Sequence, residues 1–155
     1  MSILKHNDGK KYKTIKHILD EFKILTKNGN PFNLFLKGYY EIKQGKHKGD
    51  RILFFHAPKE NEKGIWTTLK NNEWLNIPND NKWNVFTQVQ LNKKVNTFIK
   101  SFITDNVDKK EQVVFMREKD GFHFYGIYKA SLDKLSTRIC IYNRLNNKLD
   151  TNDWI

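Results

Sequence analysis

Residues 113–130 read VVFMREKDGFHFYGIYKA, and this stretch decides the class of fold. Two runs rich in aromatic and branched residues, 113–119 and 122–130, are typical of β-strands. Asp120-Gly121 stands between them, and an Asp-Gly pair between two apolar runs is a strong signal for a tight hairpin turn. The sequence therefore predicts two antiparallel strands joined by a short turn.

Similar runs occur on both sides of this hairpin, separated by clusters of Lys, Gly, Asn and Pro. They cover residues 34–43, 51–57, 64–69, 73–77, 83–91 and 137–145. Strands and helices do not alternate regularly, which argues against a parallel doubly wound sheet. We expect an α+β fold, with seven or eight short strands in a small curved antiparallel sheet or a β-barrel.

Two segments have a helical period instead. In 14–25 apolar residues recur at i, i+3, i+4, i+7 and i+10, with Thr14 in position to cap the helix. Residues 95–103 have similar spacing. A chain of 155 residues fits one domain, 1–155, with an N-terminal helix at 14–25, a β-rich body at 34–145 and a short C-terminal tail.

Several classes of protein are not expected. No apolar run approaches the roughly 20 residues that span a bilayer, and the N-terminus lacks the features of a signal peptide. The single Cys140 excludes an intramolecular disulfide and a cysteine-based zinc site, and we expect it to be buried rather than nucleophilic. The sequence predicts a cytoplasmic protein without a membrane partner.

The charge is strongly positive. Lys and Arg outnumber Asp and Glu by 28 to 17, a net charge of +11, and most of the excess lies in the first hundred residues. Such a field attracts polyanions, and Trp66, Trp74 and Trp83 in the same region offer rings that can stack on bases. The alternative is an ordinary basic surface, because an AT-rich coding sequence also produces a Lys- and Asn-rich chain.

Basic residues gather in two turn regions beside glycines, which let backbone N–H groups approach a phosphate. Two of the scarce arginines also share one face of the predicted strand 137–145 with Tyr142, and Arg binds phosphate bidentately. The alternatives are solvated loops and a sheet face with charge pairs to Glu118 or Asp120. The predicted phosphate-binding residues are Lys10, Lys11, Lys13, Lys43, Lys46, Lys48, Arg51, Arg138 and Arg144.

A base-accepting pocket is predicted from aromatic residues. Trp74 and Trp83 flank the polar loop 76–82, where an exposed ring is expected, and Phe55 and His56 would assist them. The alternative places the tryptophans in the core.

Catalytic patterns are scarce. The histidines lack HxxxH and HExxH spacing, and glycine-rich phosphate loops are absent, so we expect no metal site and no cofactor. Glu41 and Lys43 point the same way on a strand, which would let Glu hold a metal while Lys steadies a phosphate. This triplet resembles half of the metal-dependent nuclease motif of restriction enzymes. The missing Asp would have to be Asp8 or Asp20, and the alternative is a solvated charge pair.

Two stretches also resemble known families. Residues 49–66 are similar to the Gly-Asp-plus-apolar-strand signature of PUA-like domains, which include the EVE, ASCH, YTH and SRA-type readers of modified bases. Residues 83–145 are similar to a C-terminal domain of restriction-linked helicases, with 115–117 and 124–126 in place of its FVR-like and YxxLG-like motifs. The resemblance implies a curved sheet or a PUA-like β-barrel that binds nucleic acid through one pocket, often in a defence or modification context.

We therefore predict a non-catalytic nucleic-acid-binding module, for DNA rather than RNA, that reads a modified base in a defence, counter-defence or modification context. One alternative is an inhibitor or adaptor of the phage anti-defence type, with a protein partner in a defence complex. The other is a small metal-dependent nuclease centred on Glu41 and Lys43.

Overall fold

The computed structural model describes residues 2–24, 38–70, 72–92, 102–133 and 138–155. The chain divides into two compact units. The first unit contains Met1–Phe55, Glu111–Ile127 and Leu145–Ile155, and the second contains His56–Lys110 and Tyr128–Arg144. The single domain over 1–155 stays a prediction. In the described ranges, none of the helices has the length and apolar character needed to cross a membrane.

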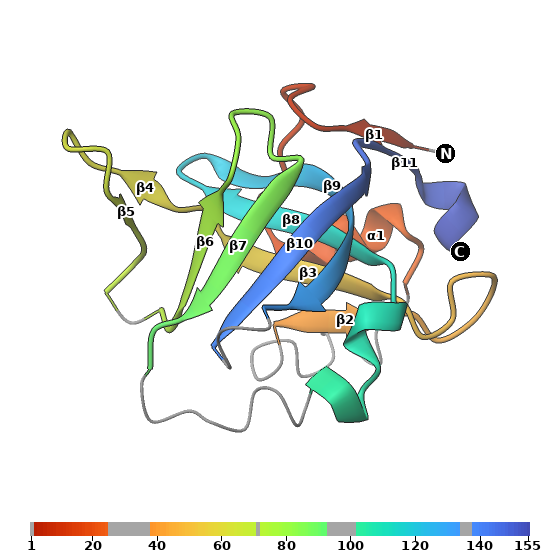
Figure 1. The fold of residues 1–155 in the computed structure, drawn as a ribbon. Helices are drawn as coiled ribbons and strands as arrows, with labels where there is room; N and C mark the ends of the chain where they lie inside the picture. The colour runs from red at the N-terminus through yellow and green to blue at the C-terminus, as the bar shows by residue number, and fades with distance from the viewer. Residues whose placement is uncertain (1, 25–37, 71, 93–101, 134–137) are drawn as a thin grey trace. The chain divides into compact units, whose positions relative to one another are not determined.

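Seven strands are hydrogen-bonded in the order β2-β3-β8-β9-β10-β7-β6 (Figure 1). Their bounds are β2 Tyr39–Glu41, β3 Arg51–His56, β6 Trp74–Pro78, β7 Val85–Gln90, β8 Gln112–Glu118, β9 Gly121–Leu132 and β10 Ile139–Asn146. Within the described residues, the two edge strands β2 and β6 do not pair, so this sheet is open rather than closed. The prediction of a small sheet-dominated α+β fold is confirmed, whereas the PUA-like barrel is not.

Several strands form where the sequence predicted them. β8 ends at Glu118 and β9 begins at Gly121, so the hairpin signalled by Asp120-Gly121 is confirmed. The predicted run 64–69 shortens to β5 Trp66–Thr67, which pairs with β4 Lys59–Glu60. Residues 34–37 of the first predicted strand lie outside the described residues.

In the first unit, helix α1 spans Ile15–Glu21 and begins as expected. Thr14 is its N-cap, and its hydroxyl oxygen accepts a hydrogen bond from the N–H of His17 at 3.3 Å. The helix ends earlier than residue 25, because Lys23 has a φ of 51°, which cannot continue a right-handed helix. Of the second predicted helix, 95–103, all but the last two residues lie outside the described ranges. A short helical stretch covers 102–104, and a 3-10 turn, η2, follows at Val107–Lys109.

The interior of the first unit is mainly apolar, although Arg51, Gln112 and Thr151 are also buried there. Aliphatic and aromatic side chains from α1, β3, β8 and β9 form one buried cluster, with Phe115 completely buried. The ring centroid of Phe115 lies 5.6–6.4 Å from those of Tyr12, Phe22, Phe54 and Phe124. Aromatic pairs at this spacing stabilise a core beyond the area that they bury.

The two ends of the chain also meet in the first unit. β1, Ile3–Lys5, pairs antiparallel with β11, Lys148–Asp150, and a 3-10 turn, η3, follows at Thr151–Trp154. The predicted C-terminal tail is therefore a short strand and a turn with Trp154 buried.

In the second unit, β7 pairs antiparallel with β6 on one side and β10 on the other. The register places Asn76 of β6 opposite Gln88 of β7, and Gln88 opposite Cys140 of β10. Directly opposite residues point to the same face of a sheet. These three strands therefore carry a row of polar and thiol side chains across one face.

Candidate nucleic-acid interface

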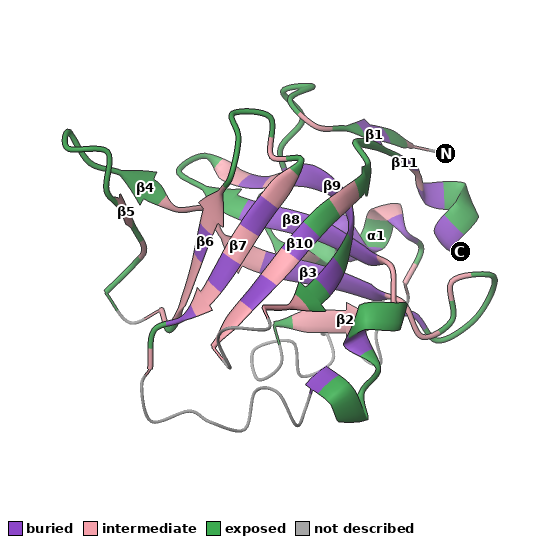
Figure 2. Cartoon of the chain, in the orientation of Figure 1, coloured by how far each residue is buried: buried purple, intermediate pink, exposed green. Residues whose placement is uncertain are grey.

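The face of the second unit that carries Asn76 is turned toward the interior. Asn76 is 1% exposed, Gln88 4% and Gln90 2%, although carboxamides are ordinarily among the exposed residues. Their aliphatic neighbours on the other face, such as Leu75 and Val89, are only half-buried. Buried and half-buried residues alternate along β7, whereas Asn76 is the one buried residue of β6 (Figure 2). Polar side chains thus occupy the positions that apolar ones fill in an ordinary strand.

These amides satisfy one another through a chain of hydrogen bonds. Asn76 Nδ2 donates to the backbone oxygen of His56 at 3.2 Å, and Gln88 Nε2 donates to Asn76 Oδ1 at 2.9 Å. The Tyr142 hydroxyl donates to Gln88 Oε1 at 3.5 Å. A buried network of this kind holds each donor and acceptor in a set direction.

Aromatic rings of β7, β9 and β10 lie in the second unit as well. Phe86 stacks on Tyr142 with centroids 4.6 Å apart and meets Tyr128 edge-on at 5.0 Å. The Tyr128 hydroxyl donates to the backbone oxygen of Trp83 at 2.7 Å, and burial raises the pKa of Tyr128 well above its ordinary range. The second unit therefore combines amide groups with stacked rings.

Trp83 is held in an unusual backbone conformation. Its φ is 63°, a left-handed value that is strained for a bulky residue. Asp80 holds the turn, because its Oδ1 accepts the N–H groups of Lys82 at 2.9 Å and Asn84 at 3.1 Å. Desolvation acts to raise the pKa of Asp80, but these N–H groups outweigh it and lower the pKa. The turn thus positions the Trp83 ring 5.7 Å from Phe86.

The predicted base pocket falls in both units. Trp74, Trp83 and His56 belong to the second unit and Phe55 to the first. All four side chains are half-buried. Trp74 and Trp83 are therefore neither fully exposed rings nor core residues, the two alternatives that the sequence offered. Their contact with a base stays a prediction.

Of the two predicted arginines, Arg144 lies in β10 and Arg138 immediately precedes it. A guanidinium nitrogen of Arg138 donates to the backbone oxygen of Gln90, and Arg144 Nη2 donates to Asn84 Oδ1 at 2.8 Å. Both groups therefore already have protein partners in the second unit.

In the first unit, the loop between β2 and β3 carries the predicted lysines. Lys43, Lys46 and Lys48 are exposed. Arg51, in contrast, is 7% exposed, and its guanidinium lies 4.1 Å from the centroid of Tyr39. Burial leaves Arg51 little surface for a phosphate.

The second predicted lysine cluster precedes α1. Lys10 Nζ lies 3.1 Å from Glu21 Oε1 and Lys11 Nζ lies 3.7 Å from Asp120 Oδ2, while Lys13 is exposed. Two of these three lysines thus have carboxylate partners within the first unit.

The nuclease-like pair is a charge pair at the sheet edge. Lys43 Nζ lies 3.7 Å from Glu41 Oε2, and both side chains are more than a third exposed. The possible third residues are engaged locally, since Asp8 accepts the Lys10 N–H and Asp20 lies 4.0 Å from Lys16 Nζ.

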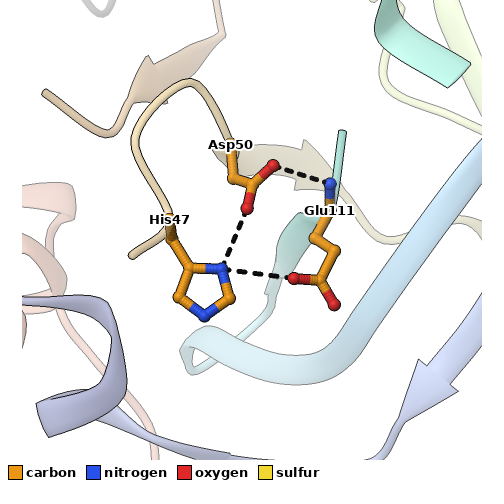
Figure 3. Close-up of side chains that lie close together, drawn as sticks. All are labelled: His47, Asp50 and Glu111. Carbon is orange, nitrogen blue, oxygen red and sulfur yellow. Dashed lines mark hydrogen bonds and ion pairs between the residues drawn. The ribbon is translucent and has the colours of Figure 1, made fainter. Parts of the chain in front are cut away.

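A cluster that sequence reasoning missed lies at the end of the basic loop. His47 Nδ1 is 2.9 Å from Asp50 Oδ2 and 3.2 Å from Glu111 Oε2 (Figure 3). The His47 ring also stacks on Trp154, with ring centroids 3.6 Å apart. The cluster contains a single histidine, so the HxxxH and HExxH patterns do not reveal it. The only sequence signal is the three-residue spacing of His47 and Asp50, because Glu111 is far away in the chain.

Sequence reasoning also missed the buried amides. The run VFTQVQ of β7 alternates, but an ordinary interpretation buries the valines and exposes the glutamines. The structure has the reverse arrangement.

No protein-family model and no curated protein matches the chain. Comparison with solved structures gives a different result. The fold resembles that of the 5-hydroxymethylcytosine-specific restriction enzyme AbaSI. The TM-score is 0.58 and the identity 16%, over 96% of this chain and 42% of the AbaSI chain. At this identity the likeness is one of fold, and the chain spans less than half the length of AbaSI.

Proposed function

We propose that this protein is a non-catalytic DNA-binding module that reads a modified cytosine, in a defence, counter-defence or modification context. The observation that carries the proposal is the fold similarity to a restriction enzyme specific for 5-hydroxymethylcytosine, over 96% of the chain. The net charge of +11 agrees with a polyanionic ligand.

The second unit has the chemistry that a base reader needs. An unstacked base is held by an aromatic surface and by hydrogen bonds to its edges, and a carboxamide offers a donor and an acceptor side by side. Trp74 lies opposite Gln90 in the register, and Asn76 follows on the same strand face. We propose that Trp74, Trp83 and His56 line the pocket and that Asn76 and Gln88 read the base.

The added group of a modified cytosine gives a physical basis for selectivity. A site built to hydrogen-bond a hydroxyl group discriminates strongly against an analogue without it, because its polar groups are then left unpaired. The Asn76–Gln88–Tyr142 chain would exchange one internal hydrogen bond for one to the base.

Phosphate contacts would come from exposed lysines of the β2–β3 loop. Each phosphate that a Lys neutralises releases counterions, so affinity falls with salt. Lys43, Lys46 and Lys48 are exposed and close together in sequence, as a backbone contact requires.

The test is fluorescence anisotropy with three duplexes of one sequence, containing cytosine, 5-methylcytosine or 5-hydroxymethylcytosine, at low and at physiological salt. We expect the tightest binding to a modified duplex and a steep loss of affinity as salt rises. Equal affinity for all three duplexes would contradict base reading, and no binding to any of them would contradict the whole proposal.

A matched pair of double variants tests the phosphate contacts. Lys46→Ala with Lys48→Ala should reduce the slope of log affinity against log salt by about 2, at roughly 0.9 per contact. Lys109→Ala with Lys119→Ala removes the same charge from two exposed positions outside the proposed track and should leave a smaller change.

The same samples test the two alternatives from the sequence. Cleavage of the duplex on addition of Mg²⁺ or Mn²⁺, abolished by Glu41→Gln, would replace the proposed reader by a nuclease. Absence of DNA binding together with one stoichiometric protein partner that resists nuclease treatment would favour the inhibitor.

A further inference from the structure

Three potential metal ligands of the first unit point at one position. His47 and Asp50 come from the β2–β3 loop, and Glu111 immediately precedes β8 (Figure 3). The imidazole Nδ1 and one oxygen of each carboxylate lie within 4.8 Å of one another. Nothing in the proposed DNA-reading function uses these three groups.

The two distances from His47 to the carboxylates fit the edges of a coordination shell. Zinc binds imidazole nitrogen and carboxylate oxygen at 2.0–2.2 Å, so two ligands 90–110° apart stand about 3.0–3.4 Å from each other. His47 Nδ1 lies 2.9 Å from Asp50 Oδ2 and 3.2 Å from Glu111 Oε2. A hydrogen-bonded ion pair has similar distances, so the charge balance is the second consideration.

The cluster carries an excess of negative charge. Among the described residues, His47 is the only cationic partner within ion-pair distance of either carboxylate. The Asp50 and Glu111 side chains are only 18% and 36% exposed, so solvent compensates them incompletely. With His47 protonated one negative charge remains, whereas a divalent ion with neutral His47 balances both carboxylates.

The ligands are also held in place from outside the cluster. The N–H of Glu111 donates to Asp50 Oδ1 at 2.9 Å, which directs the other oxygen of Asp50 toward His47. The His47 ring is parallel to Trp154, with an angle of 2° between their planes. Such supporting contacts are typical of metal ligands. Beside the cluster, His47 and Glu111 line a cleft of about 480 Å³, which gives an ion access and room for water ligands.

We propose that His47, Asp50 and Glu111 bind one divalent transition-metal ion of the Zn²⁺ class. Binding displaces the proton from His47 Nδ1 to solvent, because imidazole coordinates only through an unprotonated nitrogen. A mixed nitrogen and oxygen set suits Zn²⁺, whereas Mg²⁺ prefers oxygen ligands and keeps its water. The ion would join the basic loop to the start of β8.

The experiment measures Zn²⁺ binding to the full chain, stripped of metal and without an affinity tag, by competition with a chromophoric chelator. We expect one equivalent of Zn²⁺ per chain, a rise in melting temperature with Zn²⁺ and none with Mg²⁺. His47→Gln and Glu111→Gln should each weaken Zn²⁺ binding by at least about tenfold. Co²⁺ on the wild-type chain should give visible absorption bands, a readout that does not depend on how the variants fold.

The chain supplies its own control. His123 and Asp120 have the same three-residue spacing, with His123 Nε2 2.7 Å from Asp120 Oδ1, but belong to no three-ligand group of the described residues. His123→Gln should therefore leave Zn²⁺ affinity unchanged. Absence of Zn²⁺ binding, equal binding by wild type and His47→Gln, or an equal loss in His123→Gln would overturn the proposal.

Discussion

The two units of this protein bury different kinds of interior. The first unit packs aromatic and aliphatic side chains around Phe115, the ordinary solution for a small domain. The second unit buries Asn76, Gln88 and Gln90 and leaves aliphatic side chains of the same strands half-exposed. The first unit also buries Arg51, Gln112 and Thr151, but in the second unit the three buried carboxamides lie on two neighbouring strands, and two of them hydrogen-bond to each other.

The difference indicates where function lies. A buried carboxamide contributes less to stability than an aliphatic side chain of similar size, and it costs free energy when a partner is lost. Departures from ordinary patterning are expected at functional sites, where stability is given up for recognition. We therefore propose that base recognition belongs to the second unit, whereas the first unit supplies the aromatic core and the proposed phosphate contacts of the β2–β3 loop.

The largest effect on stability is expected in the first unit. Phe115→Ala should lower the free energy of unfolding by about 3–5 kcal/mol, because it leaves a cavity between four aromatic rings. Urea unfolding measures the loss. The remaining folded protein should keep its preference among the three duplexes, and a changed preference would contradict the division of roles.

Gln88→Leu should have a smaller effect on stability and a larger one on recognition. It leaves Asn76 Oδ1 without its donor and the Tyr142 hydroxyl without its acceptor, at a cost of about 1–3 kcal/mol. Binding to the modified and unmodified duplexes should become equal. The control is Val89→Thr, on the other face of the same strand, which should retain the preference.

A double variant tests whether the two amides act as a coupled pair. Asn76→Leu with Gln88→Leu removes both members of the amide pair, so its cost should be less than the sum of the single costs, by about 0.5–3 kcal/mol. Recognition should stay lost. Additive costs would mean that the two amides are not coupled.

Trp83→Asn removes the ring of Trp83 and should leave the backbone conformation at this position unchanged. Asn tolerates a left-handed φ, so the turn held by Asp80 should survive and stability should change by less than about 1 kcal/mol. DNA affinity should fall by about 1–3 kcal/mol, the contribution of one stacked base, with an unchanged salt slope. Trp66→Asn, outside the proposed pocket, is the control, and an equal loss there would contradict a specific role for Trp83.

The smallest effect concerns acid stability. In the first unit, a hydrogen bond from the Ser2 hydroxyl lowers the pKa of Glu21 below its ordinary 4.5, desolvation opposes this, and Lys10 adds to the lowering. A lowered folded-state pKa contributes stability above pH 4.5 that is lost as pH falls through the folded value. Glu21→Gln should therefore flatten the decline of unfolding free energy below pH 4.5, by a modest amount because solvent screens the carboxylate.

Local patterns predicted the elements well. The hairpin at Asp120-Gly121, the cap at Thr14 and the strands around β3 and β7 follow from neighbouring residues alone. The end of α1 was missed because no helix-stop residue precedes Lys23. The pairing of β1 with β11 was missed because three residues carry too little periodicity to predict a strand.

The candidate sites were predicted less well. The shared face of Arg138 and Tyr142 stays a prediction, because Arg138 precedes β10, and the strand pattern did not indicate that Arg51 would be buried against Tyr39. The His47 cluster depends on Glu111, more than sixty residues away in the chain, and no local spacing encodes that encounter.

The sequence by itself determined most positions of the longer strands, the helix start and the positive charge, because each depends on residue type and short-range period. It also determined that β7 has two unlike faces, Phe86-Gln88-Gln90 and Val85-Thr87-Val89. Only the tertiary structure decided that the glutamine face is the inner one. A period of two separates the faces of a strand but carries no information about which face the rest of the chain covers.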